Sequence, residues 1–349
     1  MARPGTMIIS PSGNLYGSEL VLLDYLNSTS LRSDVAVPAG SPFYQKLTML
    51  AVRHQIRPYK ASRLKNFYAG LLLKLIANQY GSVYLNEAGH VKYILLLSKL
   101  FPKKKFIVHV RLFEDTARNR WFLKPGDNVT IISISNYIAQ LLPYPSTVLY
   151  DAFTFHDVPA TTKKVQEDKL SIGVIGRITL TKGLGRLADL LKLMKERGVA
   201  KHYRILLYGA TSEDAVQAGF INRLQEFDNV VMCGFEPSTE KIYGAIDCVM
   251  HFSTQEALGR TFLEAIDHGK PFIGMRAAGI GEISGLLSMQ EWVADAGAAD
   301  LPEQLLTMLE KIRTNYNQVA ETVALRKPLA VKIFDRKQYA VALDKLLSV

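Results

Sequence analysis

Two glutamates lie eight positions apart around a short loop, and both could accept hydrogen bonds from hydroxyl groups. Glu256 and Glu264 flank seven residues, and Gly259 marks the point where we expect a helix to begin. The apolar run 248–252 just before them predicts a short buried strand. A strand, a tight loop and a helix start commonly hold a phosphate on backbone N–H groups. One carboxylate could then meet a sugar hydroxyl and the other a ribose, with a diphosphate between them.

Two basic residues follow another predicted strand, 171–175. Arg177 and Lys182 flank the loop after it. An arginine fork and a lysine that converge on a diphosphate would neutralise it as a leaving group. The plainer alternatives are that both are solvated charges at a turn, and that Glu256 and Glu264 only complement a helix dipole.

Strands and helices that could position these groups alternate along the chain. The first half predicts strands 7–10, 34–38, 83–86, 105–110 and 129–133, with helices 17–27, 43–53, 61–77 and 91–101 between them. The second half predicts strands 171–175, 204–208, 230–233 and 247–252, with helices 186–197, 214–225, 241–245, 260–267 and 336–347. Such βαβ alternation implies parallel sheets, whose ligands bind outside the carboxyl ends of the strands. We therefore predict an α/β chain with two Rossmann-like domains.

Composition limits the class of protein. The 349 residues are 48% hydrophobic and 21% charged, as expected of folded globular domains, and no run of eighteen apolar residues predicts a membrane span. The N-terminal apolar segment is too short for a signal peptide, and the chain has two cysteines without metal-ligand spacing, so we expect a cytoplasmic protein. Residues 1–160 hold 18 Lys and Arg against 9 Asp and Glu, which accounts for most of the net charge of +10 and predicts an anionic partner.

Several motifs are absent from the sequence. It contains no Gly-x4-Gly-Lys-Ser/Thr loop and no Gly-x-Gly-x-x-Gly fingerprint after a strand, which argues against an NTPase and a dinucleotide enzyme. It also contains no Asp-x-Asp, and its seven histidines are scattered. We therefore expect no catalytic metal and no cofactor.

The stretch from about residue 170 to 295 resembles glycosyltransferase family 4, a family of retaining enzymes. The resemblance rests on the Glu-x7-Glu pair, on the strand before Glu256, and on two further segments in the expected order, Gly176-Arg177 with Lys182-Gly183, and Gly279-Ile280-Gly281-Glu282-Ile283 as a loop. It implies the GT-B fold, in which two Rossmann-like domains face an interdomain cleft. The implied division is an acceptor-binding domain over 1–157, a polar linker over 158–169, a nucleotide-sugar-binding domain over 170–332, and a final helix over 333–349 that returns to the first domain.

The resemblance also implies an activity, the metal-independent transfer of a hexosyl or related sugar, with retention, from a nucleotide-diphosphate-sugar donor to an acceptor hydroxyl. Basic charge in the first half favours an acceptor on a lipid-linked or polysaccharide precursor. The alternative is a non-catalytic module on the same fold that binds a sugar nucleotide or a membrane. No aromatic-basic platform predicts nucleic-acid binding.

Matching residues receive roles in the second domain by the same resemblance. Arg177 and Lys182 contact the donor diphosphate, Glu264 holds the ribose, and Glu256 contacts the transferred sugar. The remaining donor-binding residues lie in the Glu-x7-Glu loop, at the start of its helix, or at other strand ends near the base: Ala257, Leu258, Gly259, Arg260, Thr261, Gly209 and Phe235.

The first domain contributes two further candidates. His109 ends a predicted strand and resembles a histidine that lines the cleft near the donor sugar, although a structural role is the alternative. Gly17 lies in a loop that resembles the Gly-Gly-x-Glu segment of the family, with Tyr16 in place of the first glycine; an ordinary turn is equally compatible. Asp151 stands where the family more often has asparagine.

A basic amphipathic stretch, 60–76, and the lysines at 103–105 match the composition of a membrane-surface helix. The alternative is a core-facing helix with a solvated basic edge. The charge asymmetry favours the first interpretation, a peripheral protein at the inner face of the cytoplasmic membrane.

Overall fold

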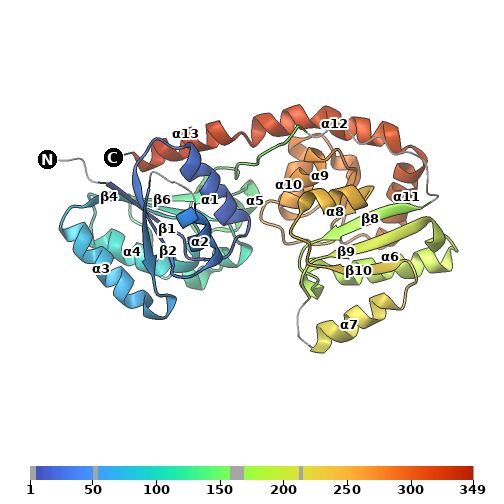
Figure 1. Ribbon diagram of the computed structural model, residues 1–349, viewed down its shortest axis with the longest axis horizontal. Coiled ribbons are helices and arrows are strands. Elements are labelled where there is room, and N and C mark those ends of the chain that lie inside the picture. Colours follow the sequence, from blue (N-terminus) through green and yellow to red (C-terminus); the bar gives the residue numbers. More distant parts are fainter. Residues whose placement is uncertain (1–4, 50–53, 158–168, 212–214, 349) are drawn as a thin grey trace. The chain divides into compact units, whose positions relative to one another are not determined.

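The computed structural model describes residues 5–49, 54–157, 169–211 and 215–348. The chain forms two compact units: unit 1, made of Met1–Thr154 and Ile333–Val349, and unit 2, Phe155–Lys332. Each unit contains one parallel sheet with helices packed on it (Figure 1). The predicted linker, 158–169, lies outside the described residues apart from Lys169.

Unit 1 is built on a seven-stranded parallel sheet of order β3-β2-β1-β4-β5-β6-β7. Its strands are β1 (Gly5–Ile9), β2 (Ser33–Pro38), β3 (Gln55–Tyr59), β4 (Tyr80–Leu85), β5 (Lys105–Val110), β6 (Val129–Ser133) and β7 (Thr147–Val148). Its helices are α1 (Gly17–Ser28), α2 (Pro42–Met49), α3 (Leu64–Ile76), α4 (Val91–Leu100), α5 (Asn136–Leu141) and α13 (Arg336–Leu347).

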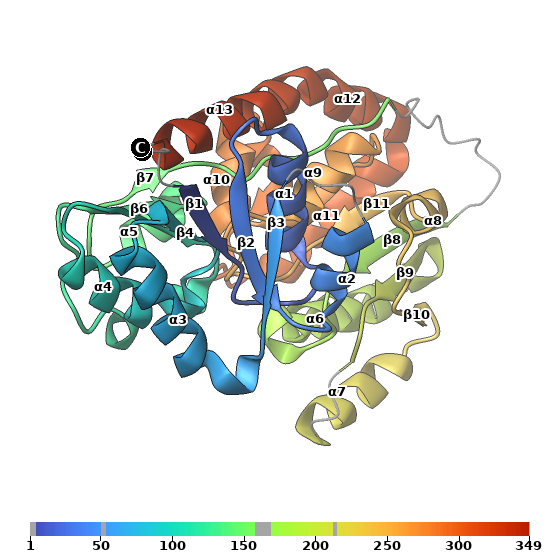
Figure 2. The ribbon, with the colours of Figure 1, turned by 60° about the vertical axis from the view of Figure 1, so that its left-hand side comes forward.

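Alternate residues of each strand face opposite sides of this sheet, and each side is buried under helices. One core contains strand residues such as Ile8, Tyr84 and Ile107 together with side chains of α1, α2 and α13. Helices α3 and α4 lie on the other face (Figure 2). There, the rings of Tyr68 and Tyr93 stack with their centroids 4.3 Å apart. The last helix of the chain is therefore part of the core of unit 1.

Unit 2 is built on a six-stranded parallel sheet of order β10-β9-β8-β11-β12-β13. Its strands are β8 (Leu170–Ile175), β9 (Tyr203–Tyr208), β10 (Val230–Gly234), β11 (Cys248–Met250), β12 (Phe272–Met275) and β13 (Val293–Ala294). Its helices are α6 (Leu184–Glu196), α7 (Ala215–Gln225), α8 (Thr239–Ala245), α9 (Arg260–Asp267), α10 (Ala278–Leu286), α11 (Leu301–Thr314) and α12 (Tyr316–Ile333), which ends one residue beyond the unit.

Both sheets reverse their strand order at one point, between β1 and β4 in unit 1 and between β8 and β11 in unit 2. The crevice at such a reversal is where open α/β sheets bind ligands. The two predicted Rossmann-like domains are confirmed, and the described helices include none that is long and apolar enough to cross a membrane.

The sequence did not predict strands β3, β7, β12 and β13 or helices α5, α11 and α12, and it assigned one further segment wrongly. Strand β3 was missed because Pro58 and Arg57 obscure its pattern; it is an edge strand, where a proline is tolerated. The segment 279–283, expected to be a loop, belongs to helix α10. Ile280 and Ile283 are fully buried one turn apart, and this apolar face stabilises the helix in spite of its glycines.

Candidate functional site

The loop between β11 and α9 carries Glu256 at the point where the order of the second sheet reverses. Gly259 ends this loop with φ +94°, a left-handed conformation that glycine adopts without strain. The loop also packs on the start of α10, where the N–H of Gly279 donates to the carbonyl of Glu256 at 2.8 Å. A Cβ on Gly279 would lie 2.5 Å from the Cα of Leu258, so the close approach requires glycine there.

Lys182 reaches the same place from the loop after β8. Gly183 has φ +83°, and a Cβ there would lie 2.2 Å from the carbonyl oxygen of Phe252. This backbone approach brings the two loops together, and Lys182 Nζ forms an ion pair with Glu256 Oε1. The structure thus joins two of the predicted site residues directly.

Glu256 has a second partner that the sequence did not single out. His251 is buried at the end of β11, and its Nε2 lies 3.3 Å from Glu256 Oε1. Burial alone would raise the pKa of Glu256, but its contacts with His251 and Lys182 outweigh burial and lower the pKa to about 2. Glu256 is therefore an anion at neutral pH.

Glu264 lies in the second turn of α9 and is half-buried. Its neighbours Phe262 and Leu263 are fully buried and anchor the helix, with Phe262 stacked on Phe272 at 4.1 Å. Tyr243 of α8, which the sequence also did not identify, donates its hydroxyl to Glu264 Oε2 at 3.3 Å. Burial raises the pKa of Glu264, with the charge of Arg260 opposing it.

The other predicted residues of unit 2 lie at neighbouring strand ends. A Cβ on Gly209 would lie 1.8 Å from the carbonyl oxygen of Gly176, so the loops after β8 and β9 touch. Arg177 in this region is exposed and has no ion pair with the residues that the structure describes. Phe235 follows β10 with 76% of its surface exposed.

The Glu-x7-Glu loop presents mostly backbone. Ala257 is half-buried and Leu258 is buried, so the Leu258 side chain holds the loop rather than facing solvent. Arg260 and Thr261 form the first turn of α9. The first backbone N–H groups of a helix have no partner within the helix and attract anions.

In unit 1, the loop after β1 leads into α1 at Gly17. Tyr16 stands where the resemblance expects glycine, but its φ of −98° suits any residue, so the exchange strains nothing. The Tyr16 N–H donates to Glu19 Oε2 at 3.1 Å and caps the helix. Gly17 itself is half-buried.

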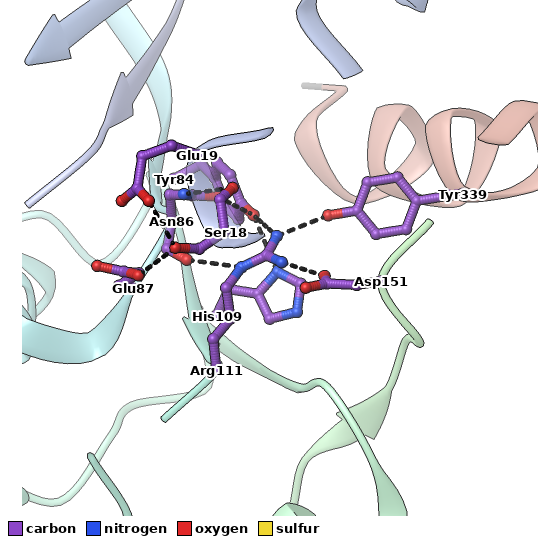
Figure 3. Close-up of polar contacts among 9 residues, drawn as sticks. All are labelled: Ser18, Glu19, Tyr84, Asn86, Glu87, His109, Arg111, Asp151 and Tyr339. Atoms are coloured by element: carbon purple, nitrogen blue, oxygen red, sulfur yellow. Dashed lines mark hydrogen bonds and ion pairs between the residues drawn. The ribbon is translucent and has the colours of Figure 1, made fainter. Parts of the chain in front are cut away.

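Two carboxylates lie beside this helix start (Figure 3): Glu19, the glutamate of the segment that resembles Gly-Gly-x-Glu, and Glu87, which the sequence did not identify. The Ser18 hydroxyl contacts both Glu19 and Glu87, the latter in the segment after β4. Burial and then the charge of Glu19 raise the pKa of Glu87 to about 7. The reversal point of the first sheet is therefore acidic, although unit 1 as a whole is basic.

His109 is fully buried in β5, one residue before the strand ends. Its Nδ1 lies 2.9 Å from the hydroxyl of Tyr84, and its Nε2 has no partner among the described residues. Burial, followed by the charge of Arg111, lowers the pKa of His109 well below its usual range. His109 is therefore neutral at pH 7.

A group of three or more His, Cys, Asp or Glu side chains could hold a metal ion. The part of the chain that the structure describes contains none. The side chains that surround Glu256 are instead a lysine and a histidine.

Comparisons with known proteins indicate the class of protein. Residues 169–311 match the family model of "Glycosyl transferases group 1". The matched domain and the two Rossmann-like units, which together have the GT-B fold, support a glycosyltransferase. No curated protein sequence matches the chain.

Particular solved structures share this fold over nearly the whole chain. Anabaena Alr3699/HepE, in complex with UDP and glucose, is 18% identical with a TM-score of 0.74 over 99% of both chains. A glycosyltransferase from Rickettsia africae is 14% identical, with a TM-score of 0.73 over 99% of this chain and 100% of that one. The lipopolysaccharide outer core galactosyltransferase WaaB is 12% identical, with a TM-score of 0.72 over 98% of each chain.

Proposed function

We propose that this chain is a retaining glycosyltransferase of family 4 that transfers a hexosyl or related sugar from a nucleotide-diphosphate-sugar to an acceptor hydroxyl, without a metal ion. The observation that carries the proposal is the ion pair of Lys182 and Glu256 at the reversal point of the second sheet, next to the start of α9. A cation for a diphosphate, a carboxylate for sugar hydroxyls and a helix start for a phosphate meet there. The UDP and glucose bound by the HepE protein support this choice of ligand.

Each predicted residue has a proposed task. Lys182 and the exposed Arg177 neutralise the diphosphate, and Glu256 accepts hydrogen bonds from the transferred sugar. Glu264, already held by Tyr243, accepts from the ribose. The backbone of 257–259 and the first turn of α9 hold sugar and phosphate. We assign to His109 and Gly17 of unit 1 the contacts with the donor sugar and its phosphate that the resemblance implies.

The reaction needs no protein nucleophile in this scheme. The acceptor oxygen attacks the anomeric carbon on the face from which the nucleotide departs, so the bond from that carbon to the phosphate oxygen breaks as the new glycosidic bond forms. The leaving phosphate takes the acceptor proton. The protein contributes orientation and electrostatic stabilisation of the departing diphosphate.

We further propose that the acceptor is part of a lipid-linked or polysaccharide precursor, reached at an anionic membrane surface. The outer sides of α3 and α4 expose Leu73, Ile76, Leu96 and Leu100 by 52–66%. Lysines at 65, 74, 92, 99, 103 and 104 accompany them in the sequence. Exposed aliphatic side chains among lysines are typical of interfacial helices.

Thermal unfolding with UDP, GDP, ADP, CDP and dTDP, each with and without EDTA, tests the donor site. A nucleotide at 100 times its Kd should stabilise the protein by about 2.7 kcal/mol. We expect one nucleotide to do so regardless of EDTA, and its sugar conjugates to be turned over. Stabilisation without turnover by any sugar conjugate would identify a non-catalytic binding module instead, and a shift abolished by EDTA would contradict metal independence.

A further inference from the structure

A buried polar cluster surrounds His109 in unit 1, and the proposed function does not explain it (Figure 3). We call it the Arg111 cluster. Each residue of the cluster is at most 4% exposed. The residues lie on β4 and β5, in the segments that follow these strands, in the segment after β7, and on helix α13. Its members are Tyr84, Asn86, His109, Arg111, Asp151 and Tyr339.

Arg111 organises this cluster through every nitrogen of its guanidinium. Nη1 forms an ion pair with Asp151, and Nε donates to the carbonyl of Asn86 at 2.9 Å. Nη2 donates to the hydroxyl of Tyr339 at 2.8 Å and lies 3.4 Å from that of Tyr84. A buried arginine needs such a full set of partners, because an unpaired charge there would cost several kcal/mol.

The charge of Arg111 explains why an aspartate stands at position 151. The resembling family more often has asparagine at this position, but a neutral side chain would leave the Arg111 guanidinium without a countercharge. The two residues act as a matched pair.

Tyr84 transmits the effect of Arg111 to His109. Its hydroxyl faces Arg111 Nη2 on one side and has a single proton to give, either to His109 Nδ1 at 2.9 Å or to Asn86 Oδ1 at 3.2 Å. The positive charge of Arg111 makes this hydroxyl a better donor and a poorer acceptor. Donation to the closer atom, Nδ1, leaves the proton of the neutral imidazole on Nε2.

This assignment gives His109 a directed donor. The Nε2 atom is buried and has no hydrogen-bond partner in the described parts of the chain. A buried donor without an acceptor is costly, and sugar hydroxyl oxygens are suitable acceptors. The residues that the structure describes therefore supply no acceptor for a proton on Nε2.

We propose that Arg111 and Tyr84 are positioning residues that hold His109 as the neutral tautomer protonated on Nε2, so that it donates a hydrogen bond to an oxygen of the bound donor sugar. This proposal rests on the proposed function. Asp151 and Tyr339 keep Arg111 in place. They also lie close to the points where the chain leaves unit 1, after Thr154, and returns to it, at Ile333.

The decisive variant is Tyr84→Phe, because it removes the hydroxyl while the ring still fills the core. Tyr80→Phe is the matched control: Tyr80 lies on the same strand and donates to Asp34 at 2.5 Å, away from the cluster. Nitrogen-15 NMR of the histidine side chains, assigned with a His109→Gln variant, reports which ring nitrogen carries the proton. We expect the Nε2–H form in the parent protein and in Tyr80→Phe, and a mixture of tautomers in Tyr84→Phe.

Substrate measurements complete the test. UDP-glucose, but not UDP alone, should shift the Nε2 proton resonance of the parent protein. For the sugar donor that is turned over, Tyr84→Phe should lower kcat/KM by about tenfold to a hundredfold, as when the partner of a functional imidazole is removed, while UDP affinity stays unchanged.

Two results would overturn the proposal: an Nδ1–H tautomer or a charged imidazole at pH 7 in the parent protein, or equal losses of activity in Tyr84→Phe and Tyr80→Phe. The NMR measurement of the tautomer does not require the enzyme to turn over a substrate. If no sugar donor reacts and none shifts the resonance, the proposed function fails, whereas the tautomer still decides the positioning role of Tyr84.

Discussion

Replacing Glu256 by glutamine should separate binding of the nucleotide from transfer of the sugar. The ion pair occupies Lys182 when no ligand is bound, so a diphosphate must compete with Glu256 for the ammonium group. Glutamine keeps the shape of the side chain and removes its charge. We expect Glu256→Gln to bind UDP more tightly and to transfer sugar more slowly than the parent protein.

The size of the effect follows from the pKa of Glu256. A fall from 4.5 to about 2 corresponds to about 3 kcal/mol of net stabilisation of the carboxylate, which His251 and Lys182 share. Lys182 and Glu256 are 29% and 20% exposed, and solvent screening reduces the share of Lys182 to about 1 kcal/mol. In Glu256→Gln, UDP no longer has to replace this interaction of about 1 kcal/mol, so its binding should tighten about fivefold. Loss of the sugar contact should lower kcat by about a hundredfold.

Calorimetric titration with UDP at low and high salt measures the change in UDP affinity. The rate at which nucleotide is released from the sugar donor measures the change in kcat. The gain in affinity should shrink at high salt, because a freed surface charge is screened. Glu291→Gln is the matched control, since it frees Lys311 from an exposed ion pair elsewhere in unit 2. If Glu256→Gln weakened UDP binding as much as Lys182→Met does, competition for Lys182 would be refuted and Glu256 would have to hold the nucleotide or its loop.

Three further predictions concern other parts of the chain. The pKa of Glu87 is about 7 in the folded protein, above its ordinary value of 4.5, so ionisation of this carboxyl destabilises the fold increasingly as the pH rises between these two values. Glu87→Gln should therefore raise the free energy of unfolding at pH 8 by up to about 3 kcal/mol and leave it unchanged below pH 4.5. Unfolding measurements check this, with Asp127→Asn as the exposed control. Glu264→Ala should weaken UDP binding about tenfold and abolish any preference for UDP over its 2′-deoxy analogue in calorimetry, whereas a retained preference would exclude Glu264 as the ribose ligand. Leu73→Ser should reduce retention on anionic vesicles at low salt, while Leu325→Ser, equally exposed in α12, should not; no retention of the parent protein would refute the membrane proposal.

The sequence predicted most strands because they are buried on both faces and therefore appear as short apolar runs. Strand β8 is such a run, as are β9 and β11. Helix α10 was hidden by its glycines, although Gly279 is needed by the backbone of Leu258 rather than by a loop. Local pattern therefore predicted the sheets well, but it could not show where tertiary packing imposes a glycine.

The candidate site likewise contains residues that could be predicted from the sequence and residues that could not. Lys182 and Glu256 were predictable because nearby glycines mark their loops in the sequence. Arg111 was not, since its partner Tyr339 lies 228 positions away, and Tyr243 gave no signal before the fold placed it beside Glu264. Contacts between residues far apart in sequence leave no local pattern, and most contacts of the Arg111 cluster are of this kind.

The position of α13 has a consequence for synthesis on the ribosome. Leu343 and Leu347 are buried in the first core, yet they are made after the whole of unit 2. The 178 residues of unit 2 take about 10–35 s to translate at typical rates of about 5–20 residues per second. During this time the nascent core of unit 1 lacks its final helix and exposes apolar surface that chaperones recognise. Unit 2 can thus finish folding before unit 1, although the strands of unit 1 leave the ribosome earlier.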